Sequence, residues 1–61
     1  MEFRSLGQAI DRAIEVHRAN YPESLPYSAE VTESHDGITY WVTLRADHFS
    51  MPVAYAIAKL P

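Results

Sequence analysis

Length and composition limit what this chain can be. With 61 residues and no cysteine, we expect one domain spanning residues 1–61, without disulfides or thiolate zinc sites. A net charge of −3 and 48% hydrophobic residues fit a globular protein rather than a disordered one. No apolar run approaches the roughly 20 residues that cross a bilayer, and the N-terminus lacks a signal-peptide pattern. We therefore expect no membrane contact and a cytoplasmic protein of a bacterium or host cell.

The first predicted element is an amphipathic helix over residues 6–19. Ser5 and Gln8 have the spacing of a capping box, and Pro22 prevents the helix from continuing. At about 100° per residue, one face of this helix is apolar. That face holds Leu6, Ile10, Ala13, Ile14 and His17. We interpret His17 as a core or edge histidine whose ring nitrogens find polar partners. A buried switch or base is the alternative, but no acid lies three or four residues away on this face.

Two strands are predicted next, over residues 27–34 and 38–45, because apolar and polar residues alternate in both. The dipeptide Asp36-Gly37 between them predicts a two-residue type I′ turn. Such a turn places Val31 opposite Val42 and brings the apolar residues of both strands to one side of the hairpin. A slip of one residue would separate them, so the turn and the strand pattern support the same register.

Trp41 is the residue that this register singles out. It lies on the face opposite Tyr40 and Val42, and it is exposed if only one face of the sheet is covered. An exposed tryptophan among polar residues, often with arginine, is typical of a protein-binding hot spot. The predicted partner-binding residues are Trp41, Glu30, Thr32, Thr43, Arg45, Glu33 and Asp36. Two alternatives remain open, in which Trp41 packs beneath the C-terminal segment or a loop, or against its copy in a homodimer.

The last segment, residues 53–60, carries two conflicting signals. Ser50 and Pro52 suit a helix start, and alternate alanines favour a helix. The alternation of Val53, Tyr55 and Ile57 instead fits a third strand. We expect the helix. The predicted fold is a small two-layer α+β domain of order α-β-β-α with an antiparallel hairpin, and α-β-β-β is the alternative.

The sequence contains no recognisable catalytic or metal-binding motif, and we predict no enzyme activity, no metal and no cofactor. His35 and Asp36 lie at the hairpin tip, whereas Asp47 and His48 follow the second strand. These pairs should lie at opposite ends of that strand, so a joint acid–base or metal site is not expected.

We expect a protein-binding module that modulates or inhibits a larger partner. Chains of this size are common among phage and mobile-element accessory proteins, such as anti-CRISPR inhibitors of host defence. Residues 21–37 contain four acidic and no basic residues, which suits a basic partner surface, although a solvated loop and hairpin is the simpler interpretation. The alternative is a nucleic-acid-acting module, such as a toxin ribonuclease or transcription regulator. It draws on Arg4, Arg12 and Arg18 with Trp41 and Tyr55, but the acidic balance opposes direct nucleic-acid binding.

Overall fold

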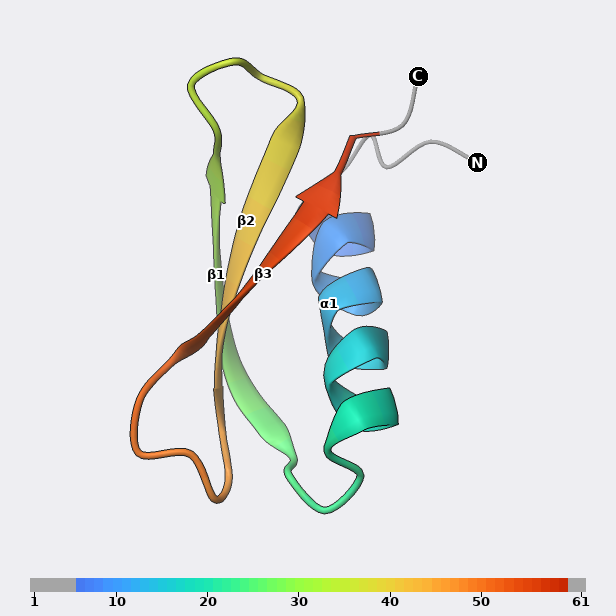
Figure 1. Cartoon of the computed structure of the whole chain (residues 1–61), viewed down its shortest axis with the longest axis vertical. Coiled ribbons are helices and arrows are strands. Elements are labelled where there is room, and N and C mark those ends of the chain that lie inside the picture. The colour runs from blue at the N-terminus through green and yellow to red at the C-terminus, as the bar shows by residue number, and fades with distance from the viewer. Residues whose placement is uncertain (1–5, 60–61) are drawn as a thin grey trace.

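The structure of the protein is a computed structural model, which describes residues 6–59. A helix, α1 (Leu6–Asn20), precedes three strands, β1 (Pro26–Glu33), β2 (Thr39–Ala46) and β3 (Val53–Ala58). The strands form an antiparallel sheet in the order β1-β2-β3, and α1 lies against one face of it (Figure 1). The fold is therefore a small α+β domain with one helical layer and one sheet layer, in the order α-β-β-β. Within residues 6–59, no helix is long and apolar enough to cross a membrane.

Helix α1 forms where the periodicity predicts it. Ala9, Ala13 and His17, each four residues apart, are fully buried and face the sheet. The helix ends where the Asn20 side chain donates a hydrogen bond to the Val16 carbonyl, 3.0 Å away. The predicted cap residue Ser5, the arginine at position 4 and the residue at position 60 lie outside the described part of the chain.

The β1–β2 hairpin has the predicted register. Val31 pairs with Val42, Ala29 with Leu44 and Thr32 with Trp41. A bulge between Pro26 and Ser28 interrupts the ladder near the start of β1. Because the side-chain period of a strand is two, this register puts the apolar sets of both strands on the side that faces α1.

The turn itself differs from the prediction. A type I′ turn needs positive φ at both central residues, but only Gly37 has it, at 75°, and Asp36 does not. The Gly37 N–H instead donates to the Ser34 carbonyl at 3.1 Å, and the Ser34 N–H donates to the Thr39 carbonyl at 2.9 Å. The type I′ prediction is therefore wrong, and a four-residue loop, 35–38, connects the same paired residues.

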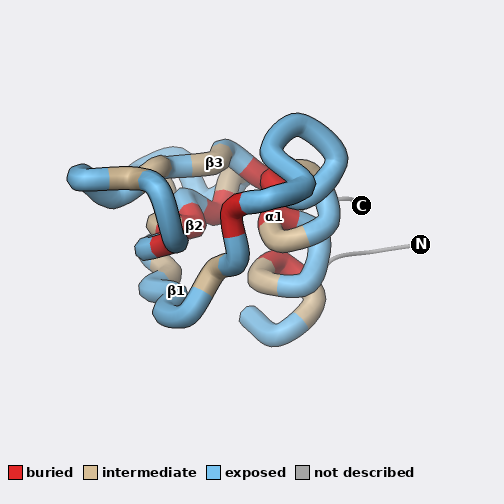
Figure 2. The backbone as a smooth tube through the Cα atoms, turned by 90° about the horizontal axis from the view of Figure 1, so that it is seen from below, coloured by how far each residue is buried: buried red, intermediate tan, exposed pale blue. Residues whose placement is uncertain are grey.

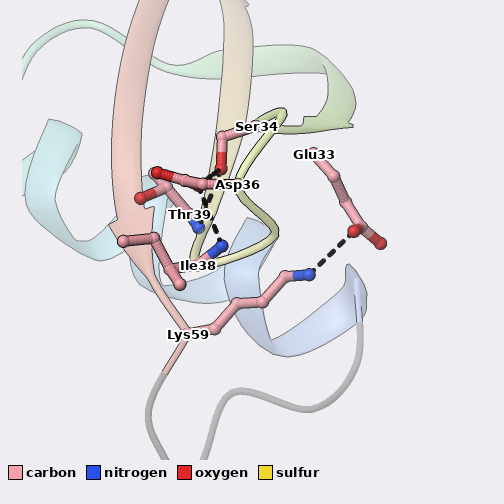
Figure 3. A network of polar contacts seen from close by, with 6 residues as sticks. All are labelled: Glu33, Ser34, Asp36, Ile38, Thr39 and Lys59. Carbon is pink, nitrogen blue, oxygen red and sulfur yellow. Dashed lines mark hydrogen bonds and ion pairs between the residues drawn. The ribbon is translucent and has the colours of Figure 1, made fainter.

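Side-chain hydrogen bonds explain why this longer loop forms (Figure 3). The Ser34 hydroxyl donates to the Asp36 carboxylate and accepts from the Thr39 N–H. The same Asp36 oxygen accepts from the Ile38 N–H at 3.1 Å. Local bonds of this kind compete with the tight turn that the dipeptide alone favours. They also hold the pKa of Asp36 below its usual 3.8, the Ser34 hydroxyl having the largest effect and the Ile38 N–H the next.

Residues 53–58 form a strand, so the favoured helix prediction for this segment is wrong. Strand β3 pairs with β2, with Tyr55 opposite Val42 and Ile57 opposite Tyr40. Alanine's helix preference is worth only a few tenths of a kcal/mol per residue over its neighbours. Burying one large apolar side chain is worth about 1.5–3 kcal/mol, and Ile57 is only 6% exposed. Tertiary packing therefore outweighs local propensity here.

The core lies between α1 and the central strand, where the buried residues concentrate (Figure 2). It contains Ala9 and Ala13 of α1, Tyr40, Val42 and Leu44 of β2, and Ile57 of β3. Coverage is uneven, because α1 packs more closely on β2 and β3 than on β1. Tyr27 and Ala29 of β1 are exposed, although the alternation places them on the same side as the core.

Candidate functional site

The face of the sheet opposite α1 is open in the described part of the chain. We call it the outer face. It consists of Ser28, Glu30 and Thr32 of β1, Trp41, Thr43 and Arg45 of β2, and Ala54 and Ala56 of β3. Trp41 lies on the central strand, paired with Thr32 on one side and Ala56 on the other, and 45% of it is exposed. Trp41 is therefore exposed in the single chain rather than packed beneath the C-terminal strand or a loop of residues 6–59.

The polar residues around Trp41 lie where the register places them. Glu30 pairs with Thr43, and Ser28 pairs with Arg45. Glu30, Thr32 and Arg45 are exposed, and Thr43 is half-buried. Trp41 and these four predicted partner-binding residues are therefore brought together on one surface.

Glu33 and Asp36 do not share this surface. Glu33 pairs with Tyr40 on the helix side of the sheet, and its carboxylate accepts a hydrogen bond from Lys59 Nζ at 2.8 Å (Figure 3). Lys59 Nζ also lies 4.5 Å from the centre of the Tyr40 ring. The bond to Glu33 is the main cause that raises the pKa of Lys59 above 10.5. Asp36 is held within the turn, so both carboxylates serve intramolecular contacts.

A second cluster of functional groups surrounds His17, at the end of α1. His17 is fully buried, with its Nδ1 2.5 Å from the Tyr55 hydroxyl and its Nε2 3.0 Å from Ser24 Oγ. Its ring centre lies 5.3 Å from those of Tyr21 and Phe49. The interpretation of His17 as a core histidine with partnered nitrogens is therefore confirmed.

The directions of these hydrogen bonds follow from Ser24. Its hydroxyl donates to the Asp47 carbonyl at 2.5 Å, and a hydroxyl has only one proton to donate. Ser24 Oγ must therefore accept from His17 Nε2–H. In the neutral ring Nδ1 is then unprotonated and accepts from the Tyr55 hydroxyl. Burial is the main cause that raises the pKa of Tyr55 above 10.0, so its hydroxyl keeps the proton at neutral pH.

This direction is opposite to that of an activated serine. In a catalytic pair, histidine accepts the serine proton, whereas here Nε2 donates to Ser24 and the serine proton is committed to a backbone carbonyl. The cluster instead joins α1, the following loop, the β2–β3 loop and β3. Tyr55 reaches His17 only because β3 is a strand, whereas Tyr21, four residues after His17, could have been placed beside it from the helical spacing. Ser24 and Phe49 lie in loops, and their positions follow from no local pattern.

An open hollow of about 460 Å³ lies beside this cluster, between the α1–β1 loop and the β2–β3 loop. It is lined by Asn20, Tyr21, Pro22, Glu23, Ser24, His48 and Phe49. His48 has a φ of 70°, an unusual conformation for a residue other than glycine. The lining of the hollow combines the aromatic rings of Tyr21 and Phe49 with polar residues, and the side chains of Ser24 and His17 are already paired.

The two histidine–aspartate pairs lie at opposite ends of β2, as expected. His35 and Asp36 belong to the loop before β2, and Asp47 and His48 to the loop after it (Figure 1). Within residues 6–59, no group of three or more His, Cys, Asp or Glu residues is arranged to hold a metal ion.

Comparison with known proteins supplies no relative for this chain: no family model, no curated protein and no solved structure matches it.

Proposed function

We propose that this chain is a non-catalytic protein-binding module that modulates a larger partner through its outer face. The observation that carries the proposal is the position of Trp41. A large aromatic side chain lies on the central strand, as the third of its eight residues, on the face that α1 does not cover, and 45% of it is exposed.

The exposed area of Trp41 is large enough to matter for binding. A tryptophan side chain can bury up to about 250 Å². An exposed fraction of 45% therefore leaves roughly 100 Å² for a partner to cover, which is worth about 2.5 kcal/mol at about 25 cal/mol per Å². That value reaches the level of an interface hot spot.

The surroundings of Trp41 support an interface rather than an isolated exposed side chain. Thr32 and Ala56, its neighbours across the sheet, are small and leave the indole accessible. Glu30 and Arg45 provide charges of both signs at the rim, which suits a polar ring around an apolar centre. A partner with an apolar pocket surrounded by polar groups fits this surface. Binding of this chain inhibits such a partner if the covered pocket is part of the partner's active or binding site.

The proposal is tested by capturing partners from host lysate and measuring the affinity of the purified partner for Trp41→Ala. We expect binding to weaken by about 30-fold or more, corresponding to roughly 2 kcal/mol. Met51→Ala is the matched control, because Met51 is 74% exposed but lies in the β2–β3 loop, and it should bind normally. Circular dichroism verifies that both variants fold. Equal binding by the two variants contradicts the proposal, as does submicromolar, salt-sensitive binding to nucleic acid.

A further inference from the structure

Strand β1 is an open edge of the sheet. The order β1-β2-β3 leaves one side of β1 without a neighbouring strand among residues 6–59. An edge strand presents unpaired N–H and C=O groups, which can pair with another extended chain. Proteins often protect such edges, and the bulge between Pro26 and Ser28 does so at the start of β1. The rest of the strand, to Glu33, has regular pairing with β2.

The backbone groups that face outward can be identified. The Ser34 N–H donates to the Thr39 carbonyl, so residues 34 and 39 form a hydrogen-bonded pair. In an antiparallel ladder such pairs alternate with pairs that make no bond across the ladder. Glu30 and Thr32 therefore direct their backbone groups to β2, whereas Ala29, Val31 and Glu33 direct theirs to the open side.

The open edge borders an apolar cleft that α1 leaves uncovered. Tyr27 is 69% exposed, Ala29 is exposed and Val31 is only half-buried, although all three lie on the helix side of the sheet. The cleft between α1 and β1 has a volume of about 240 Å³. Its lining includes Ile14, Tyr27, Ala29 and Leu44. An added strand would place alternate side chains over this cleft.

The acidic charge of residues 21–37 indicates which kind of strand would bind beside β1. Residues 21–37 contain no Lys or Arg. On the helix side, the Glu33 carboxylate is already paired with Lys59. On the outer face, Glu30 is exposed and stands beside the position of an added strand. A second copy of β1 would bring its own glutamates to this edge, and like charges across adjacent strands are unfavourable.

We propose that β1 binds an extended peptide segment of another protein by strand addition, in which apolar and basic residues alternate. The apolar side chains enter the cleft between α1 and β1, and the basic side chains lie beside Glu30 on the outer face. This site uses the edge and the helix side of β1. It does not depend on Trp41, so it is tested independently of the function proposed above.

The test uses three capped eight-residue peptides, which match the length of β1. One alternates lysine and valine, one has the same residues as a lysine block followed by a valine block, and one alternates glutamate and valine. Titration followed by NMR should show the alternating lysine peptide binding about tenfold or more tightly than either of the others. The amide signals of Ala29, Val31 and Glu33 should shift and gain protection from hydrogen exchange.

Two variants and two control variants test the geometry. Ala29→Pro removes an outward N–H without removing a bond to β2, and should weaken binding of the alternating lysine peptide about tenfold. Ala29→Val is the matched control and should bind normally. Glu30→Lys should reverse the preference between the lysine and glutamate peptides, and it provides the decisive result if Ala29→Pro fails to fold. Trp41→Ala should bind the peptide normally.

Three results overturn the proposal. The first is equal binding of the alternating and block peptides, which would indicate charge attraction alone. The second is an unchanged peptide preference in Glu30→Lys. The third is a set of shifted amides centred on Trp41 instead of β1.

Discussion

The hydrogen bonds around His17 make a sharp prediction about Ser24. Replacing Ser24 with alanine leaves His17 Nε2–H without an acceptor, and His17 is fully buried. The Asp47 carbonyl loses its donor in the same variant. Leaving one buried polar group unsatisfied costs about 1–3 kcal/mol. We therefore expect Ser24→Ala to lower the free energy of unfolding by about 1–3 kcal/mol, with the unpaired Nε2–H as the main cause.

Replacing His17 itself should cost less than truncating its partner. In His17→Phe the ring remains to pack against Tyr21 and Phe49, Ser24 still donates to Asp47, and the half-buried Tyr55 hydroxyl can turn to water. No buried donor is stranded, so the cost should stay below about 1 kcal/mol. Adding Ser24→Ala to His17→Phe should then cost at least about 1 kcal/mol less than Ser24→Ala costs alone.

Urea denaturation followed by circular dichroism measures all three variants. A chain of this size has an m value near 1 kcal/mol per M, so Ser24→Ala should lower the midpoint by about 1–3 M. Ser28→Ala, on the exposed outer face, is the control and should stay within about 0.5 kcal/mol of the parent. The reasoning is refuted if Ser24→Ala costs less than about 0.5 kcal/mol, or if its effect is the same with and without His17.

Two further predictions concern the turn and the alkaline limit of stability. Gly37 has a φ of 75°, and a methyl group added to its Cα would meet no atom within 4 Å. Gly37→Ala should therefore cost about 1 kcal/mol through backbone strain alone, measured by urea denaturation. Gly37→Asn should cost less, and equal costs would contradict a strain origin. The raised pKa of Tyr55 contributes stability that is fully present below pH 10.0 and is lost as the pH rises through the folded-state pKa. Tyr55→Phe should therefore lose less stability than the parent over that range in thermal melts, and parallel losses would contradict this assignment.

The sequence by itself determined which residues of the β1–β2 hairpin lie on each face. Strand side chains alternate with a period of two, so a correct register assigns every residue to a face at once. Val31 with Val42 and Thr32 with Trp41 follow from that rule, and so does the exposure of Trp41 once one face is left open. The helical period of 3.6 likewise placed His17 on the buried face of α1.

The turn shows what local sequence rules could not predict. The dipeptide Asp36-Gly37 correctly located the reversal and the residue with positive φ. It did not reveal that the Ser34 hydroxyl would bond both Asp36 and the Thr39 N–H and so stabilise a longer loop. Competing side-chain hydrogen bonds of similar energy decide between such loops, and their balance depends on three-dimensional geometry.

Only the tertiary structure decided the identity of residues 53–58 and the groups around His17. In this segment the local preference for a helix and the strand-like alternation nearly balance. Pairing with the free edge of β2 beneath α1 buries more apolar area when the segment is a strand than when it is a helix. That choice brings the Tyr55 hydroxyl to His17, although 38 residues separate them in sequence. It also completes a sheet wider than one helix can cover, which leaves the apolar side of β1 exposed. Burial is a property of the whole assembly of elements, so no local pattern contains it.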